Sequence, residues 1–371
     1  MALLNIIALL VLVLYAILLS FGAMGFMSAV VFNVDEKKEN HTRATIIICA
    51  RNEEKNIELC LRSILNQNFN KDLIEIIVVD DASSDTTSAI VTSIFQDKTF
   101  RSSFLINAKQ KGKKVSITQA IEQCAGDLII IRDADTFTDD NNWLKTIVNF
   151  YEDTKKEFII APVQITSENN FLSQLQNSEN LALSVITGGY AFYKKAFLCN
   201  GANLAFTKNI FNAVTGYSSH IKIASGDDVL LLEDVKKKFP ETIGYLKQKS
   251  ASVFTYPAQN IMTFISQRTR WAGKSKINPN PINFLMGFFV FFAHFFTLFY
   301  LSKLLFIPHL GLFGLFFVFG RLFIDFLLLF LASRFYGKGP NWLLFLPLNL
   351  MYSVCVLVIT LLTLFYKPKW K

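Results

Sequence analysis

Apolar residues form long runs at both ends of the chain. Residues 1–34 carry no charged side chain, and three runs near the C-terminus, at 283–306, 309–332 and 341–365, carry very few. A membrane-spanning helix needs about 20 mostly apolar residues. The pattern therefore predicts one N-terminal span and three C-terminal spans. A cleaved signal peptide is the alternative for the first run, but such a peptide starts with basic residues, and residues 1–5 contain none.

Between these runs, short β-rich segments alternate with segments of helical periodicity. Strands are expected at 45–49, 73–79, 104–107 and 127–131, with helices at 53–67 and 114–124 and another that starts after a turn at 83–87. This alternation predicts an α/β domain with a parallel sheet, whose ligands bind at the carboxyl ends of the strands. Asp80, Asp81, Asp133 and Asp135 all fall at such ends.

Composition narrows the class of protein. Hydrophobic residues make up 52% of the 371, and the formal net charge is +8. The basic residues suit a solvated face with positive-inside topology, or else a phosphate-rich ligand or an anionic membrane surface. They are scattered and no nucleic-acid motif accompanies them, so we expect no nucleic-acid partner. The five cysteines show no C-x-x-C spacing, which argues against a disulfide framework or zinc site and fits a reducing cytoplasm.

The membrane segments raise two further points. The charged central region and the basic loop at 334–338 should both be cytoplasmic. The predicted spans then place residues 367–371 outside, so either one C-terminal segment is only interfacial or the positive-inside rule is weakly broken. Arg321 and Asp325, four residues apart within one span, can pair and face the helix bundle. A role in handling a lipid or an acceptor is the alternative.

The acidic residues at the strand ends indicate two kinds of contact. Asp133 and Asp135 follow a buried strand, and together they can hold Mg²⁺ or Mn²⁺, which prefers a few carboxylates plus substrate phosphates. Asp80 and Asp81 can accept hydrogen bonds from a nucleotide base or a ribose hydroxyl. Helix capping is the alternative for this second pair.

Two motifs in the second half complete the candidate chemistry. In the acidic turn at 225–228, Asp228 can serve as the base that a sugar or lipid hydroxyl needs before it attacks. Arg270 can neutralise a departing diphosphate, and Trp271 can stack on a sugar ring. The alternatives are an acidic turn that only caps a helix, and an interfacial helix with aromatic and basic anchors.

In this order, these motifs resemble a family 2 glycosyltransferase of the processive-synthase type, a group that includes cellulose, hyaluronan and poly-N-acetylglucosamine synthases and is similar to ceramide glucosyltransferases. The resemblance covers about residues 43–275. Its motifs are Ala50-Arg51-Asn52-Glu53-Glu54, Val78-Val79-Asp80-Asp81-Ala82-Ser83, Lys111-Gly112-Lys113, Asp133-Ala134-Asp135, Asn200-Gly201-Ala202-Asn203, Gly226-Asp227-Asp228 and Gln267-x-x-Arg270-Trp271.

The resemblance implies a GT-A (Rossmann-like) catalytic domain flanked by transmembrane helices. It implies that the donor pocket is lined by Ala50, Arg51, Glu53, Asp80, Asp81, Lys113 and Asp133. It makes Asp133 and Asp135 the metal ligands and Asp228 the base, with Gln267, Arg270 and Trp271 closing over donor and acceptor. Asn203, Asp227 and Trp271 are the expected acceptor contacts. The family usually has Asn where Thr118 stands, which puts one donor contact in doubt.

We therefore expect an inverting, metal-dependent glycosyltransferase that transfers a sugar from a nucleotide-sugar, by family resemblance a UDP-sugar, to a growing glycan. Single transfer to a membrane lipid and a non-catalytic, nucleotide-sugar-sensing scaffold are the alternatives. The enzyme should be multi-pass in the plasma (inner) membrane among membrane lipids, with its catalytic domain cytoplasmic. The expected divisions are an anchor at 1–34, a GT-A domain at 42–240, an interfacial region at 241–281 and C-terminal spans at 282–366.

Overall fold

A computed structural model describes residues 1–96, 100–166, 168, 170–221, 223, 226–273, 280–306 and 311–365. Several sequence predictions involve positions outside these residues, namely residue 225 of the acidic turn, residues 309 and 310 of the third predicted span, and residues 367–371. The chain divides into two compact units, which are described separately. One is helical and contains Met1–Ser28, Ile165–Tyr190 and the described residues between Pro257 and Phe365. The other, the α/β unit, contains Ala29–Gln164 and Ala191–Tyr256.

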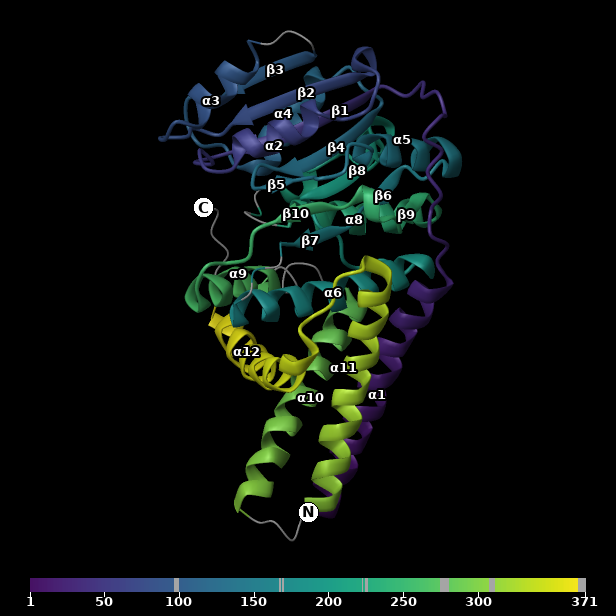
Figure 1. The fold of residues 1–371 in the computed structure, drawn as a ribbon, viewed down its shortest axis with the longest axis vertical. Coiled ribbons are helices and arrows are strands. Elements are labelled where there is room, and N and C mark those ends of the chain that lie inside the picture. The colour runs from purple at the N-terminus through teal and green to yellow at the C-terminus, as the bar shows by residue number, and fades with distance from the viewer. Residues whose placement is uncertain are drawn as a thin grey trace. The chain divides into compact units, whose positions relative to one another are not determined.

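The α/β unit is built on a seven-stranded sheet of order β3-β2-β1-β4-β8-β6-β9 (Figure 1). Its strands are β1 (Ala44–Ala50), β2 (Ile74–Asp80), β3 (Arg101–Ile106), β4 (Leu128–Asp133), β6 (Phe158–Ile160), β8 (Asn203–Thr207) and β9 (Ile243–Tyr245). A smaller sheet of order β5-β10-β7 contains β5 (Thr136–Phe137), β7 (Val163–Ile165) and β10 (Val253–Thr255). The four predicted strands all form, each with its bounds shifted by one to three residues.

Strand β8 departs from the predicted parallel sheet. β3, β2, β1 and β4 are parallel to one another, as expected, but β8 runs antiparallel to both β4 and β6. The alternating strands and helices before residue 131 predict only parallel neighbours. An apolar run such as that of β8 carries no information on its direction, because Leu204 and Phe206 are buried equally well whichever way the strand runs.

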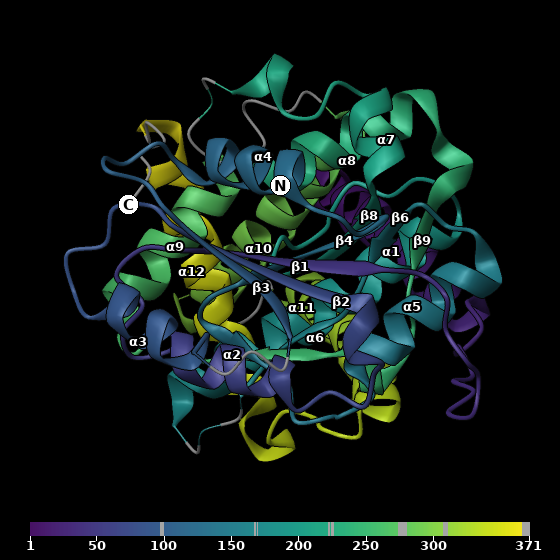
Figure 2. The same cartoon turned by 90° about the horizontal axis from the view of Figure 1, so that it is seen from above.

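The two faces of the sheet are buried by different helices. Figure 2 shows α2 and α3 on one side of strands β1 and β2, and α4, α7 and α8 on the other. Alternate residues of β1 explain this layering, since Ile46 and Ile48 join the core with α2 and α5, while Ile47 joins the core with α4, α7 and α8. These helices are α2 (Ile57–Leu65), α3 (Thr87–Ile94), α4 (Lys113–Gln123), α5 (Trp143–Thr154), α7 (Lys208–Ala213) and α8 (Asp227–Lys238).

The helical unit contains the four predicted spans. Among the described residues, the helices long and apolar enough to cross a membrane are Ala2–Ser28, Pro281–Leu304, Gly311–Tyr336 and Trp342–Phe365. The unit's helices are α1 (Ala2–Ser28), α6 (Phe171–Phe192), α9 (Ile261–Gly273), α10 (Pro281–Phe306), α11 (Gly311–Tyr336) and α12 (Phe345–Phe365). Helix α6 belongs to this unit as far as Tyr190. Within it, α1, α10 and α11 pack on one another, and α12 packs on α9 and α10 (Figure 1).

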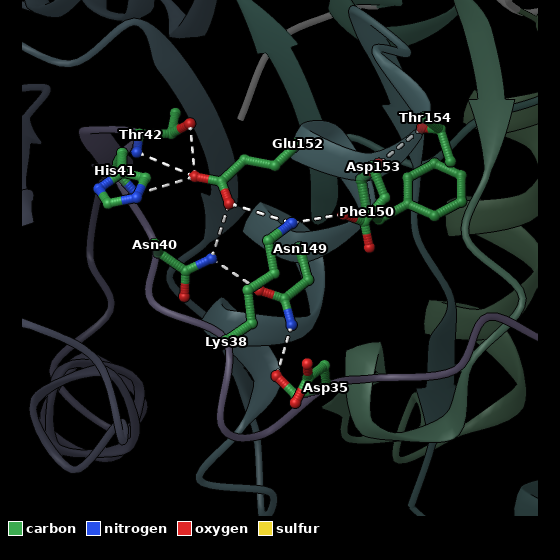
Figure 3. Close-up of polar contacts among 10 residues, drawn as sticks. All are labelled: Asp35, Lys38, Asn40, His41, Thr42, Asn149, Phe150, Glu152, Asp153 and Thr154. Atoms are coloured by element: carbon green, nitrogen blue, oxygen red, sulfur yellow. Dashed lines mark hydrogen bonds and ion pairs between the residues drawn. The ribbon is translucent and has the colours of Figure 1, made fainter.

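Side chains of α5, with Glu152 foremost, hold the segment that precedes β1 (Figure 3). Glu152 Oε1 accepts hydrogen bonds of 3.0 Å from the backbone N–H groups of His41 and Thr42, and one of 2.9 Å from the Thr42 hydroxyl. Its Oε2 accepts from Asn40 Nδ2 at 3.1 Å and pairs with Lys38 Nζ at 3.3 Å. Partial burial would raise the pKa of Glu152, but these hydrogen bonds, that of His41 foremost, lower it to about 2.

Candidate functional site

The parallel strands bring the expected donor-site residues to one edge of the sheet. In the strand register Ala50 lies opposite Asp80, and Cys49 lies opposite Asp133. Arg51 and Glu53 follow directly in the turn after β1, and both are partly exposed. The geometry thus gathers the residues that the sequence analysis assigned to the nucleotide-sugar. Their contacts with a donor stay a prediction.

Two non-glycine residues at this edge adopt left-handed backbone conformations. Asn52 follows β1 with φ of 56°, and Ala82 follows β2 with φ of 61°. The Asn52 side chain accepts a 2.8 Å hydrogen bond from the Ser84 N–H, while the Asn52 N–H donates to the Ser83 hydroxyl at 3.0 Å. The two turns therefore hold each other in place. Left-handed conformations of such residues are uncommon and concentrate at binding sites.

Asp80 and Asp81 are only 1% and 2% exposed, and both carboxylates are already engaged. Asp80 accepts from the Ser83 N–H at 2.8 Å and from the Ser88 hydroxyl. Asp81 accepts from the backbone N–H groups of Lys111 and Gly112, both at 2.8 Å. In this structure the pair holds the turn after β2 and the loop before α4. Their expected contact with a nucleotide stays a prediction.

Lys113 links acidic residues from two parts of the chain. Its Nζ donates to Asp133 Oδ1 at 2.6 Å and lies 3.2 Å from Asp227 Oδ2. Burial disfavours the charged ammonium, but Asp133 and Asp227 outweigh it and raise the pKa of Lys113 well above its ordinary value. The ammonium thus joins the end of β4 to the start of α8. The sequence analysis placed Lys113 near a diphosphate but missed this bridge, because nothing in the chain's spacing pairs residues 113 and 227.

The expected base lies beside this bridge. Asp228 occupies the first turn of α8, where the helix N-terminus favours negative charge, and its Oδ2 accepts a 3.3 Å hydrogen bond from the Gly201 N–H. A Cβ on Gly201 would lie 3.3 Å from both Asp227 Oδ2 and Lys113 Nζ. Gly201 therefore lets the backbone approach the charged groups closely. Residue 225 of the acidic turn lies outside the described structure.

Asp135 completes the acidic group. Residue 135 as a whole remains exposed, but the surrounding protein limits hydration of the carboxylate. This desolvation, followed by the nearby charges of Asp133 and Glu53, raises the pKa of Asp135 to about 7. Two carboxylates that repel each other in this way favour a cation between them. In the described part of the chain, no group of three or more His, Cys, Asp or Glu side chains could hold a metal alone. The residues fit a metal whose remaining ligands are donor phosphates and water.

A pocket of about 220 Å³ opens next to the bridge. Its lining includes Lys111, Lys113 and Lys114, Gly112 at the start of α4, and Asp227. Lys114 Nζ is bound to the carbonyls of His220 and Ile223, but Lys111 is exposed beside the N-terminus of α4, a combination that suits a phosphate.

Asn203, an expected acceptor contact, is fully buried. Its Nδ2 donates to the carbonyls of Pro162 and Ala251 at 2.7 and 2.8 Å, and its Oδ1 accepts from Trp143 Nε1 at 3.3 Å. Every polar atom of the side chain is thus used inside the unit. The acceptor role stays a prediction, which this burial does not favour.

Gln267, Arg270 and Trp271 lie on α9 in the helical unit, so their place at the donor site also stays a prediction. The helix is organised by Arg268, which the sequence analysis did not single out. Arg268 pairs with Glu179 of α6 at 2.6 Å through both Nε and Nη2 and lies 4.3 Å from the centre of the Trp271 ring. This packing fixes Trp271, whose side chain is 37% exposed.

The described fold is of the GT-A type, the architecture of many enzymes that use nucleotide-sugars. The chain aligns over 97% of its length with 99% of a solved mannosyltransferase, PcManGT from Pyrobaculum calidifontis in complex with GDP-Man and Mn²⁺, at a TM-score of 0.58 and 16% identity. This likeness confirms the predicted fold.

Residues 45–215 match the family model for Glycosyl transferase family 2, so the chain carries a glycosyltransferase family 2 domain over these residues, as expected. Relatives include a probable glycosyltransferase YdaM of Bacillus subtilis, 26% identical over 71% of this chain and 63% of that protein. The poly-beta-1,6-N-acetyl-D-glucosamine synthase of Staphylococcus aureus is 27% identical over 44% of this chain and 41% of its own length. The matches thus span less than two thirds of either relative.

Proposed function

We propose that this protein is a membrane-bound inverting glycosyltransferase that moves a sugar from a nucleotide-sugar to a growing glycan. The observation that carries the proposal is the Lys113 bridge between Asp133 and Asp227. Asp228 directly follows Asp227 in the first turn of α8. This contact network supports the proposal because it combines an ammonium that suits phosphates with carboxylates that suit a metal and a base. The family 2 domain and the synthase relative support the same reading.

In the proposed reaction, Asp228 takes the proton of an acceptor hydroxyl as the hydroxyl oxygen attacks the anomeric carbon. The bond between that carbon and the diphosphate oxygen breaks, and the nucleoside diphosphate leaves. Lys113 and the start of α4 stabilise the negative charge that builds up on the leaving group. Asp133 and Asp135 would hold Mg²⁺ or Mn²⁺, which would neutralise the diphosphate. The solved mannosyltransferase of this fold contains Mn²⁺, in keeping with this assignment.

The four long apolar helices support a multi-pass membrane protein, and we propose that the α/β unit faces the cytoplasm, where nucleotide-sugars are made. The acceptor can be a polysaccharide or a single membrane lipid. The synthase relative favours the polysaccharide. The small number of candidate spans among the described residues favours the lipid, because a long polymer needs a larger channel. Product length distinguishes them, since a processive synthase makes long chains and a lipid glycosyltransferase adds one sugar.

The test is release of nucleoside diphosphate by the detergent-purified full chain with Mn²⁺ or Mg²⁺ and a membrane lipid extract. UDP-N-acetylglucosamine and GDP-mannose head the donor panel. Asp228→Asn should lower turnover at least about 100-fold, the contribution of a positioned base. Glu241→Gln, which changes a carboxylate that is 67% exposed, is the matched control and should retain full activity. Donor binding without turnover of any donor would instead favour the nucleotide-sugar-sensing scaffold.

A further inference from the structure

A polar cluster lies inside the helical unit, built by side chains from different spans. Asp325 of α11 accepts from the Tyr15 hydroxyl of α1 at 2.5 Å and from Arg321 Nη2 at 2.6 Å. It also accepts from Asn349 Nδ2 of α12 at 2.9 Å. Arg321 Nη1 donates in turn to the Ser353 hydroxyl of α12 at 3.1 Å. Tyr15 and Asp325 each lie near the middle of their helices, far from either end.

Internal pairing explains the charges of this cluster but not all of its polar atoms. Ionisable groups within spans are costly and mark functional sites by default. Arg321 and Asp325 neutralise each other. In the described structure, however, Arg321 Nε and Asn349 Oδ1 are buried and have no hydrogen-bond partner. One is a donor and the other an acceptor, and a hydroxyl group can satisfy both kinds.

An aromatic wall adjoins these polar groups. The ring of Phe326 lies 5.1 Å from that of Trp342 and 5.9 Å from that of Phe345. Phe326 directly follows Asp325, and Phe345 lies four residues before Asn349, on the same face of α12. The Trp342 side chain is 40% exposed. Anchoring at a membrane interface is the ordinary role of such a tryptophan, but here its ring packs on Phe326, which follows Asp325 in the chain, and on Phe345, one helical turn before Asn349.

We propose that Asp325, Asn349 and Arg321, together with the wall of Phe326, Trp342 and Phe345, bind the neutral sugar group of a membrane glycolipid. The C–H face of a sugar ring packs on aromatic rings, while its hydroxyls both donate and accept hydrogen bonds. The ligand is uncharged because the guanidinium and carboxylate already cancel, which leaves no net charge for a phosphate. It is an amphiphile because the binding residues belong to helices apolar enough to span a membrane.

The test uses the full chain, purified in a detergent without a sugar headgroup and placed in phosphatidylcholine nanodiscs. Native mass spectrometry would compare retention of monoglucosyl-diacylglycerol with that of diacylglycerol, the same lipid without its sugar. Wild type should retain the glucosyl lipid at least about tenfold more strongly. Trp342→Leu and Asn349→Leu should each abolish the preference. The matched control is Asn5→Leu, which removes a different polar pair of the bundle, the 2.9 Å hydrogen bond from the Tyr300 hydroxyl.

Several outcomes would overturn this proposal. Equal retention of both lipids by wild type would show that the sugar is not recognised, and an intact preference in Trp342→Leu and Asn349→Leu would show that it binds elsewhere. Should Asn349→Leu fail to fold, the partly exposed Trp342 still provides the test. If soluble maltotriose displaces the lipid at equal concentration, the glycolipid assignment falls. No donor is present, so these results do not depend on whether the protein transfers a sugar.

Discussion

Replacement of Glu152 by glutamine tests the hydrogen-bond network that fastens the segment before β1 to α5. Glutamine has the same shape but no charge, so it loses the charge-assisted bonds from His41, Thr42 and Lys38. The pKa of Glu152 drops from 4.5 to about 2. At about 1.4 kcal/mol per pKa unit, the upper bound is about 3.4 kcal/mol. Solvent screening at this surface site reduces the expected loss at pH 7 to about 1–2 kcal/mol.

The pH dependence gives the sharper signature. The folded pKa lies below the ordinary value, so the stabilisation is fully present above about pH 4.5 and is lost as pH falls toward about 2. Wild type and Glu152→Gln should therefore differ at pH 7 and converge progressively below pH 4.5. Urea titrations of the detergent-solubilised chain, followed by tryptophan fluorescence, measure the difference, and buried Trp143 of α5 is a local reporter.

The control is Asp153→Asn on the same helix, where the carboxylate is 45% exposed and pairs with Lys38. It should change stability by less than about 0.5 kcal/mol. A Glu152→Gln protein as stable as wild type at pH 7 would refute the reasoning. So would a deficit that stays constant down to pH 3, because that pattern indicates lost packing rather than lost charge.

Three further substitutions or labelling tests address the α/β unit. Gly201→Ala puts a Cβ 3.3 Å from Lys113 Nζ and from Asp227 Oδ2. It should lower donor turnover about tenfold or more and change the free energy of unfolding by less than about 1 kcal/mol. Unchanged kinetics would contradict a close approach of the Gly201 backbone to these charges. Asn203→Leu leaves two buried carbonyls and an indole N–H without hydrogen-bond partners, and should lower the free energy of unfolding in urea by about 2–4 kcal/mol. A stable variant with a raised acceptor KM would instead support the acceptor role. Burial raises the pKa of Cys60 to about 11, so maleimide at pH 7 should label it only after unfolding.

The strands that carry the site could be predicted because they are continuous apolar runs that end in acidic residues. The segment 127–131 identified β4, and its parallel neighbours then placed Asp80 and Asp133 at one edge. Strands such as β5, β7 and β10 have only two or three residues, too few for a recognisable period. Their pairing is set by tertiary contacts alone.

Side-chain roles were harder to predict than side-chain positions. A carboxylate at a strand end can bind a ligand or hold a loop, and the residue type does not decide between them. Asp81 is taken up by backbone N–H groups of the loop before α4, whereas Asp135 remains exposed beside like charges. Likewise, Asn203 is as polar as any acceptor contact, and only the surrounding carbonyls reveal its structural use.

The Lys113 bridge implies an order of events in the proposed reaction. Without donor, the Lys113 ammonium contacts both Asp133 and Asp227 and offsets the repulsion between their like charges. A diphosphate that binds beside Lys113 competes for the same ammonium, and a metal on Asp133 competes from the other side. Donor and metal should therefore bind cooperatively. The donor draws Lys113 away from Asp133 and so frees the carboxylate for the metal, and the metal displaces Lys113 from Asp133 and so frees the ammonium for the donor. Lys113→Met should weaken this cooperativity to the part that direct contact between metal and donor phosphates supplies, whereas a site that binds metal and donor independently would show none in wild type either.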